Sequence, residues 1–120
     1  MSLKRSSEIN SILGDEGTKI KEYFHPQNTQ KGINYSLAQF TLESGGKSKL
    51  HKIKSSEIFY ILQGEGSIEI NKELFQLKKD DSIYVPPNSE QFIKNTGTNN
   101  LVFLCIVEPA WKIEDETILE

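Results

Sequence analysis

The chain has 120 residues, of which 36% are hydrophobic and 26% are charged, and its formal net charge is −3. This composition is typical of one globular domain with one core, and it argues against a disordered chain or a membrane protein. Only one of the 14 basic residues, Arg5, is an arginine, and the lysines alternate with acidic residues. Because arginine supplies the paired contacts that read phosphates and base edges, no nucleic-acid partner is expected.

The single cysteine, Cys105, excludes a disulfide within the chain. The first residues carry no signal-peptide pattern, and the longest apolar run, residues 101–107, is far below the ~20 residues that cross a bilayer. These features favour a cytoplasmic protein that has no membrane partner. Cys105 itself lies in a fully apolar stretch, which predicts a buried, inert thiol rather than a nucleophile.

The N-terminal segment, residues 1–17, differs from the rest of the chain. Ser6 and Ser7 can cap a short helix that runs to about Leu13, and Gly14 or Gly17 can end it. From residue 18 onward, short apolar runs alternate with turn signals such as "SGG", "QGEG" and "PPNS". Strands are predicted at 18–24, 33–43, 48–54, 57–63, 66–71, 73–78, 82–85, 90–95 and 101–108. This pattern predicts an all-β sandwich or barrel over 18–108, after the helical segment 1–17 and before a C-terminal tail, 109–120.

The alternation within three strands predicts three polar side chains that point inward. In "KLHKIK" the lysines mark the wet face, so His51 and Ile53 face the core. In "EIFYIL" Glu57 shares a face with Phe59, and because the opposite face is also apolar, this strand should be covered on both sides. In "EQFIKN" Gln91 is on the inward face. His51, Glu57 and Gln91 can therefore converge if their strands are neighbours in a closed structure.

The stretch 45–64 resembles the first motif of the cupin family. That motif is a glycine, five residues, His-x-His, a short spacer, a glutamate, six residues and a glycine. Here Gly45, His51, Glu57 and Gly64 occupy those positions at matching spacings, and Ile53 replaces the second histidine.

The stretch 80–95, "DDSIYVPPNSEQFIKN", resembles a variant of the second cupin motif, which is a glycine, five residues, Pro-x-Gly, two residues, a histidine, three residues and an asparagine. Pro86 and Asn95 match. Asp80 and Asn88 replace the two glycines, and Gln91 replaces the histidine. Asparagine at 88 fits a left-handed turn, a conformation that it adopts more readily than most residues.

The resemblance implies a double-stranded β-helix of the jelly-roll type over residues 18–108, and a homodimer. It also implies a divalent metal inside the barrel, held here by His51, Glu57 and Gln91. Such a mixed nitrogen and oxygen set suits Fe, Mn, Ni, Co or Zn. The alternative is that the three side chains hydrogen-bond to one another and to water without a metal. Both readings remain open at this point.

Three functions follow from these readings. One is an enzyme of isomerase or dioxygenase type that acts on a sugar phosphate or small carbonyl compound, with Glu57 or His51 moving a proton. The second is a module that binds or senses a small molecule without catalysis. The third is an assembly role, in which residues 1–17 and the tail, anchored by Trp111 on the barrel or on a second subunit, make the contacts. His25, which precedes a proline, is expected in a surface turn.

Overall fold

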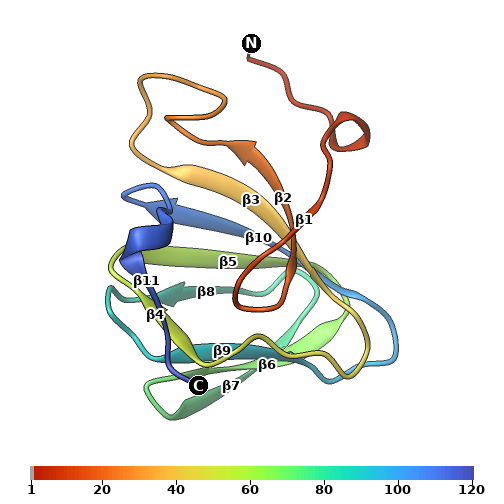
Figure 1. Cartoon of the computed structure of the whole chain (residues 1–120). Helices are drawn as coiled ribbons and strands as arrows, with labels where there is room; N and C mark the ends of the chain where they lie inside the picture. Colours follow the sequence, from red (N-terminus) through yellow and green to blue (C-terminus); the bar gives the residue numbers. More distant parts are fainter. Residues whose placement is uncertain (1) are drawn as a thin grey trace.

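The computed structural model describes residues 2–120, which form two facing antiparallel sheets (Figure 1). The larger sheet has the strand order β1-β2-β3-β10-β5-β8, and the smaller has the order β11-β4-β9-β6-β7. The strands of the larger sheet are β1 (Ile12–Leu13), β2 (Lys19–Phe24), β3 (Ser36–Leu42), β10 (Leu101–Glu108), β5 (Ser56–Gln63) and β8 (Ser82–Val85). Those of the smaller sheet are β11 (Glu116–Ile118), β4 (His51–Ile53), β9 (Gln91–Asn95), β6 (Glu65–Ile70) and β7 (Glu73–Lys78).

The all-β jelly-roll architecture is the predicted one, and each strand predicted from residue 18 onward is present. The two-residue period that predicted these strands is visible in their burial. In β10, every second side chain from Leu101 to Val107 is buried and the residues between are partly exposed. Among residues 2–120, no helix is long and apolar enough to cross a membrane.

The predicted N-terminal helix is wrong. Residues 6–8 form a single 3-10 turn that buries none of its residues, and Ile12 and Leu13 form strand β1. A helix this short is marginal unless it packs against a core, whereas β1 gains backbone hydrogen bonds along the edge of β2. The predicted segment 1–17 also includes residue 1, which lies outside the described residues.

The core lies between the two sheets. Phe103 of β10 is at its centre, with ring centroids 5.5 Å from Phe40 and 5.3 Å from Phe59. Both distances are typical of favourable aromatic pairs. The buried cluster also contains Ile61, Ile68, Val85, Leu101, Leu42, Ile53, Ile70, Leu77, Ile93, Cys105 and Val107. Side chains from both sheets thus pack together in one core.

The prediction that strand β5 is covered on both faces is wrong for the single chain. On its outer face, Ile58 and Tyr60 are 44% and 39% exposed. Tyr84 of β8 and Ile106 of β10 pair with Ile58 on either side and are also exposed. The apolar pattern of β5 therefore reflects a buried inner face and an apolar outer face that this chain leaves uncovered.

The turns use left-handed backbone at the positions where the cupin motifs carry glycine. Asn88 has φ = 61° and Asp80 has φ = 73°, so both substituted residues keep the glycine-like conformation. Gly64 has φ = 84°, and a Cβ atom there would lie 2.6 Å from the Asn100 carbonyl oxygen. The left-handed turn predicted at Asn88 is confirmed.

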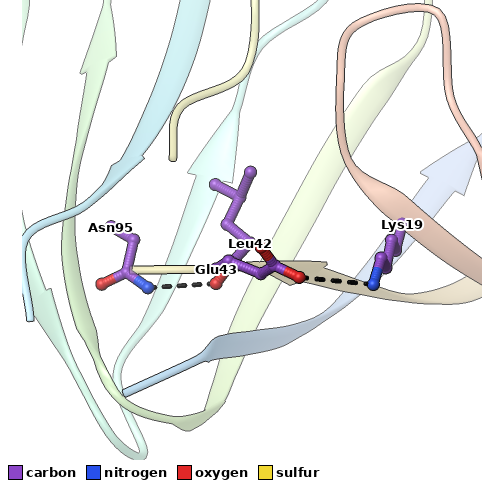
Figure 2. A network of polar contacts seen from close by, with 4 residues as sticks. All are labelled: Lys19, Leu42, Glu43 and Asn95. Carbon is purple, nitrogen blue, oxygen red and sulfur yellow. Dashed lines mark hydrogen bonds and ion pairs between the residues drawn. The ribbon is translucent and has the colours of Figure 1, made fainter. Parts of the chain in front are cut away.

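Asn95, the last residue of β9, ties the two sheets together at one end (Figure 2). Its buried Nδ2 donates to the carbonyl oxygens of Leu42, 3.0 Å away at the end of β3, and of Asn99, 2.8 Å away. Its Oδ1 accepts a hydrogen bond from the Gly97 amide. Nearby, Lys19 and Glu43 form an exposed ion pair between β2 and the end of β3, which contributes little to stability. Asn95 thus has a structural role.

Candidate functional site

A cavity of about 260 Å³ lies inside the barrel, and His51, Glu57 and Gln91 all line it. The three side chains are 8%, 6% and 2% exposed, so all three point inward, as their strands predicted. Most of the remaining wall is apolar. It includes Ala38, Phe40, Ile53, Phe59, Ile93, Phe103, Cys105 and Val107. A cavity of this size is at the small end of known ligand pockets.

The sheet topology explains why the three residues meet. His51 of β4 and Gln91 of β9 are directly opposite each other in the smaller sheet. Glu57 comes from β5 in the larger sheet, and the Gln91 Nε2 donates a hydrogen bond to its Oε1 over 2.5 Å. This contact spans the barrel, so the two sheets bring together side chains that are distant in sequence.

Cys105 completes the surroundings of Glu57. Its Sγ donates to the Oε2 of Glu57 over 3.2 Å, so each carboxylate oxygen has a donor from the protein. Burial raises the pKa of Glu57, while the hydrogen bonds from Gln91 and Cys105 and the charge of His51 act in the opposite direction. Burial, together with Glu57, raises the pKa of the Cys105 thiol well above 9.0, which agrees with the predicted inert thiol.

Sequence reasoning placed Cys105 in the core but missed its contact with Glu57. In the strand pairing, Cys105 lies opposite Phe59, and Val107 lies opposite Glu57. Since β10 is almost 50 residues away from β5 in sequence, only this register brings the thiol beside the carboxylate. The alternation along residues 101–107 predicts that the Cys105 side chain points inward, but it does not predict which side chain Cys105 contacts.

His51 leaves one ring nitrogen available to the cavity. Its Nδ1 lies 2.6 Å from the Lys49 carbonyl oxygen and donates to it. Among residues 2–120, Nε2 has no hydrogen-bond partner, and in the neutral ring it carries a lone pair. The backbone contact fixes the ring orientation, so His51 presents a preorganised acceptor to whatever occupies the cavity.

Further carboxylates line the cavity where the N-terminal and C-terminal segments meet it. They are Asp15, Glu16, Glu22 and Glu116. Glu16 is buried, and both of its oxygens lie 2.8 Å from the Thr18 hydroxyl. Burial raises the pKa of Glu116; the charge of His51 opposes this effect, and Glu16 and Asp15 reinforce it. Among the described residues, no lysine or arginine lines the cavity.

Sequence reasoning missed this acidic group for two reasons. Glu16 belongs to the segment predicted as helix and its end, and Glu116 belongs to the C-terminal tail, where no strand was predicted. Instead, Glu116 begins β11, which pairs with β4 so that Glu116 lies opposite Ile53. The short strands β1 and β11 were the missing information, because they bring both termini to the cavity.

The prediction that His25 lies on the surface is wrong. His25 is in a turn, but its side chain is buried, and its Nε2 donates to the Trp111 carbonyl oxygen over 2.7 Å. The Trp111 amide in turn donates to the Ser36 hydroxyl over 3.1 Å. These backbone contacts of Trp111 hold the C-terminal tail on the barrel, while its side chain is 37% exposed; the indole ring as the anchor stays a prediction.

As it is hydrogen-bonded in this structure, the side-chain set of His51, Glu57 and Gln91 offers a divalent ion few free ligand atoms. The cupin motifs place a histidine or a glutamate at four inward positions, and Ile53 occupies one of them. The amide nitrogen of Gln91, rather than its oxygen, faces Glu57. Both oxygens of Glu57 accept hydrogen bonds, whereas the Nε2 of His51 and the Oε1 of Gln91 have no hydrogen-bond partner among residues 2–120. Nor do residues 2–120 contain a cluster of three or more His, Cys, Asp or Glu side chains that could hold a metal. The metal predicted on His51, Glu57 and Gln91 stays a prediction.

Comparisons with known proteins agree with the fold. Residues 38–107 match the family described as Cupin domain (Cupin_2). The chain is 40% identical over 114 residues to the uncharacterised protein MJ1618 of Methanocaldococcus jannaschii, covering 94% of this chain and 90% of that one. It is 34% identical over 109 residues to an oxalate-binding protein of Thermotoga maritima, covering 86% and 90%.

Solved structures give the same architecture. A predicted oxalate decarboxylase of Thermotoga maritima is similar with a TM-score of 0.77 and 27% identity, covering 89% of this chain and 98% of the other. The cupin-2 domain protein Rru_A2000 of Rhodospirillum rubrum superposes with a TM-score of 0.80 at 18% identity, covering 99% and 80%, and this likeness concerns the fold alone.

Proposed function

Since this chain belongs to the cupin family, we propose that it binds a small organic molecule in the cavity between its two sheets. The observation that carries this proposal is the state of the three inward polar residues. The two oxygens of Glu57 accept hydrogen bonds from Gln91 and Cys105, whereas the Nε2 of buried His51 has no partner among the described residues and lies at a largely apolar cavity. An apolar pocket with a few fixed polar groups is the usual form of a small-molecule site.

The wall of the cavity narrows the class of molecule. A phosphate group needs lysine, arginine or a helix N-terminus, and within residues 2–120 none of these lines the cavity. A small carbonyl or other compound without a negative charge therefore fits this site better than a sugar phosphate. If a reaction takes place, the Nε2 of His51 is positioned to accept a proton from the bound molecule, while Glu57, held by Gln91 and Cys105, stays in the wall.

The test is ligand-observed NMR with a panel of small polar and aromatic compounds, followed by titration calorimetry of the hits. We expect saturable binding to the wild-type chain and its loss in Ala38→Phe, which fills the cavity. Leu74→Ala, an exposed position on β7 away from the cavity, serves as the matched control and should bind as the wild type does. Saturable binding that survives in Ala38→Phe would refute the cavity as the site.

The second candidate is the metal-dependent reading, an isomerase-like or dioxygenase-like enzyme. Cupins often bind metals, and the free Nε2 of His51 favours this candidate. A bound ion would supply Lewis-acid chemistry, and Glu57 would first have to release one of its two hydrogen bonds. Elemental analysis of the purified chain, repeated after incubation with Fe, Mn, Ni, Co or Zn, tests it. Stoichiometric metal that is lost in His51→Phe would support this candidate over the metal-free one.

A further inference from the structure

Apart from the imidazole of His51, no basic side chain among residues 2–120 lines the cavity beside its carboxylates. The ion pairs within residues 2–120 are Arg5–Glu8 and Lys19–Glu43, both exposed, and neither involves a carboxylate of the cavity wall. Glu16 is 6% exposed, yet its carboxylate has only a neutral hydroxyl, that of Thr18, as a side-chain donor. A buried carboxylate is costly unless something positive or several donors meet it.

The lysines nearest to these carboxylates in sequence are directed elsewhere. On β2, Ile20 and Glu22 face the cavity, and the lysines at 19 and 21 alternate with them. Lys21 donates to the carbonyl and hydroxyl oxygens of Ser6, 3.1 Å away, and Lys19 pairs with Glu43. Strand alternation thus keeps the cations of this segment off the cavity wall while leaving the acidic groups on it.

A second, independent feature points to the same kind of ligand. His51 is 8% exposed, and because its Nδ1 donates to the Lys49 carbonyl, its unpartnered Nε2 can only accept a hydrogen bond while the ring is neutral. The neutral imidazole nitrogen and the carboxylate oxygens are therefore acceptors for a ligand in the cavity. They select a ligand that donates hydrogen bonds.

The apolar part of the wall is suited to the body of such a ligand. Phe40, Phe59 and Phe103 form a continuous aromatic wall, with centroids 5.3–5.5 Å apart. Ring faces attract cations within about 6 Å, and phenyl walls also shield a hydrocarbon group from water. A cavity of about 260 Å³ has room for a compact organic cation with an apolar body, which is larger than a metal ion.

We propose that the cavity selects a compact organic cation, an ammonium group on an apolar body, over neutral and anionic molecules of the same shape. This inference rests on the proposed small-molecule function and adds the charge of the ligand. One relative is named an oxalate-binding protein; oxalate is a dianion, and no lysine or arginine among residues 2–120 lines this wall to meet it.

The experiment is titration of the full chain with three probes of matched shape: benzylammonium, benzyl alcohol and benzoate. We expect benzylammonium to bind about tenfold or more tightly than either of the others, as one partly buried charge pair at intermediate dielectric implies. Glu116→Gln removes one wall charge and should reduce this preference about threefold or more. Glu73→Gln removes an equal charge from an exposed position on β7 and should leave it unchanged.

Each outcome has a distinct meaning. Equal or tighter binding of benzyl alcohol or benzoate overturns the charge selectivity but leaves the proposed function intact. If Glu73→Gln reduces the preference for benzylammonium as much as Glu116→Gln does, the preference comes from the net charge of the protein. That result would also overturn the proposed charge selectivity of the cavity. Benzoate or oxalate that binds only when Mn²⁺ or Zn²⁺ is added supports the metal reading instead. If no probe of this set or of the wider panel binds, the proposed function itself fails.

Discussion

Restoring the two histidines that the cupin motifs place at 53 and 91 tests whether four positions share one point in the barrel. Ile53 lies two residues after His51 on the same inward face of β4, and Gln91 is directly opposite His51 on β9. Consecutive inward residues on one strand are about 6.5–7 Å apart, a distance that two imidazoles can close onto one ion. We therefore expect Ile53→His/Gln91→His to create a divalent-metal site with His51 and Glu57.

The size of the effect follows from burial and binding. Replacing buried Ile53 with a histidine that has no hydrogen-bond partner should lower the free energy of unfolding of the metal-free variant by about 2–4 kcal/mol. Metal at a concentration of about a thousand times its dissociation constant should raise the free energy of unfolding by about 4 kcal/mol. For a domain of this length, that corresponds to a rise in Tm of about 10–20 °C on adding Zn²⁺ or Ni²⁺.

The assay is thermal unfolding followed by circular dichroism, with and without Zn²⁺ or Ni²⁺, for the wild type and the variant. A triple variant that adds His51→Phe is the matched control, because it keeps both new histidines and removes one ligand. Its metal-dependent rise in Tm should largely disappear. A double variant that folds but shows no metal-dependent rise would refute the convergence of positions 51, 53, 57 and 91.

Three further predictions concern pH, a turn and assembly. Because burial raises the pKa of Glu57 above its ordinary 4.5, the folded state holds this proton more tightly than the unfolded state does. Glu57 therefore supports stability at low pH, and this contribution is lost as pH rises through the raised pKa. Glu57→Gln should gain stability relative to the wild type from pH 4 to pH 8 in urea titrations, and a constant difference would contradict this. Gly64→Ala should cost about 2 kcal/mol or more, since φ is +84° and the new Cβ would meet the Asn100 carbonyl; an unchanged urea midpoint would count against it. The predicted homodimer remains untested; if the exposed face of Ile58 and Tyr84 forms it, Ile58→Lys should give a monomer in sedimentation experiments, while Leu74→Lys should not.

Local patterns in the sequence determined most of the barrel. A two-residue period is enough to predict strands from residue 18 onward and to orient His51, Glu57 and Gln91 inward, because side chains alternate across any strand. The same holds for the turn at Asn88, where left-handed backbone depends on the residue itself and its neighbours. The inert character of Cys105 likewise followed from the apolar stretch around it.

Only the tertiary structure decided what those inward side chains meet. The contacts of Glu57 with Gln91 and Cys105 depend on which strands face each other, and contacts between strands so far apart in sequence have no local signature. The termini illustrate the same point: residues 12–13 and 116–118 form strands only because β2 and β4 offer unpaired edges. Those edge pairings bring Glu16 and Glu116 to the cavity and so give it the negative charge from which its ligand was inferred.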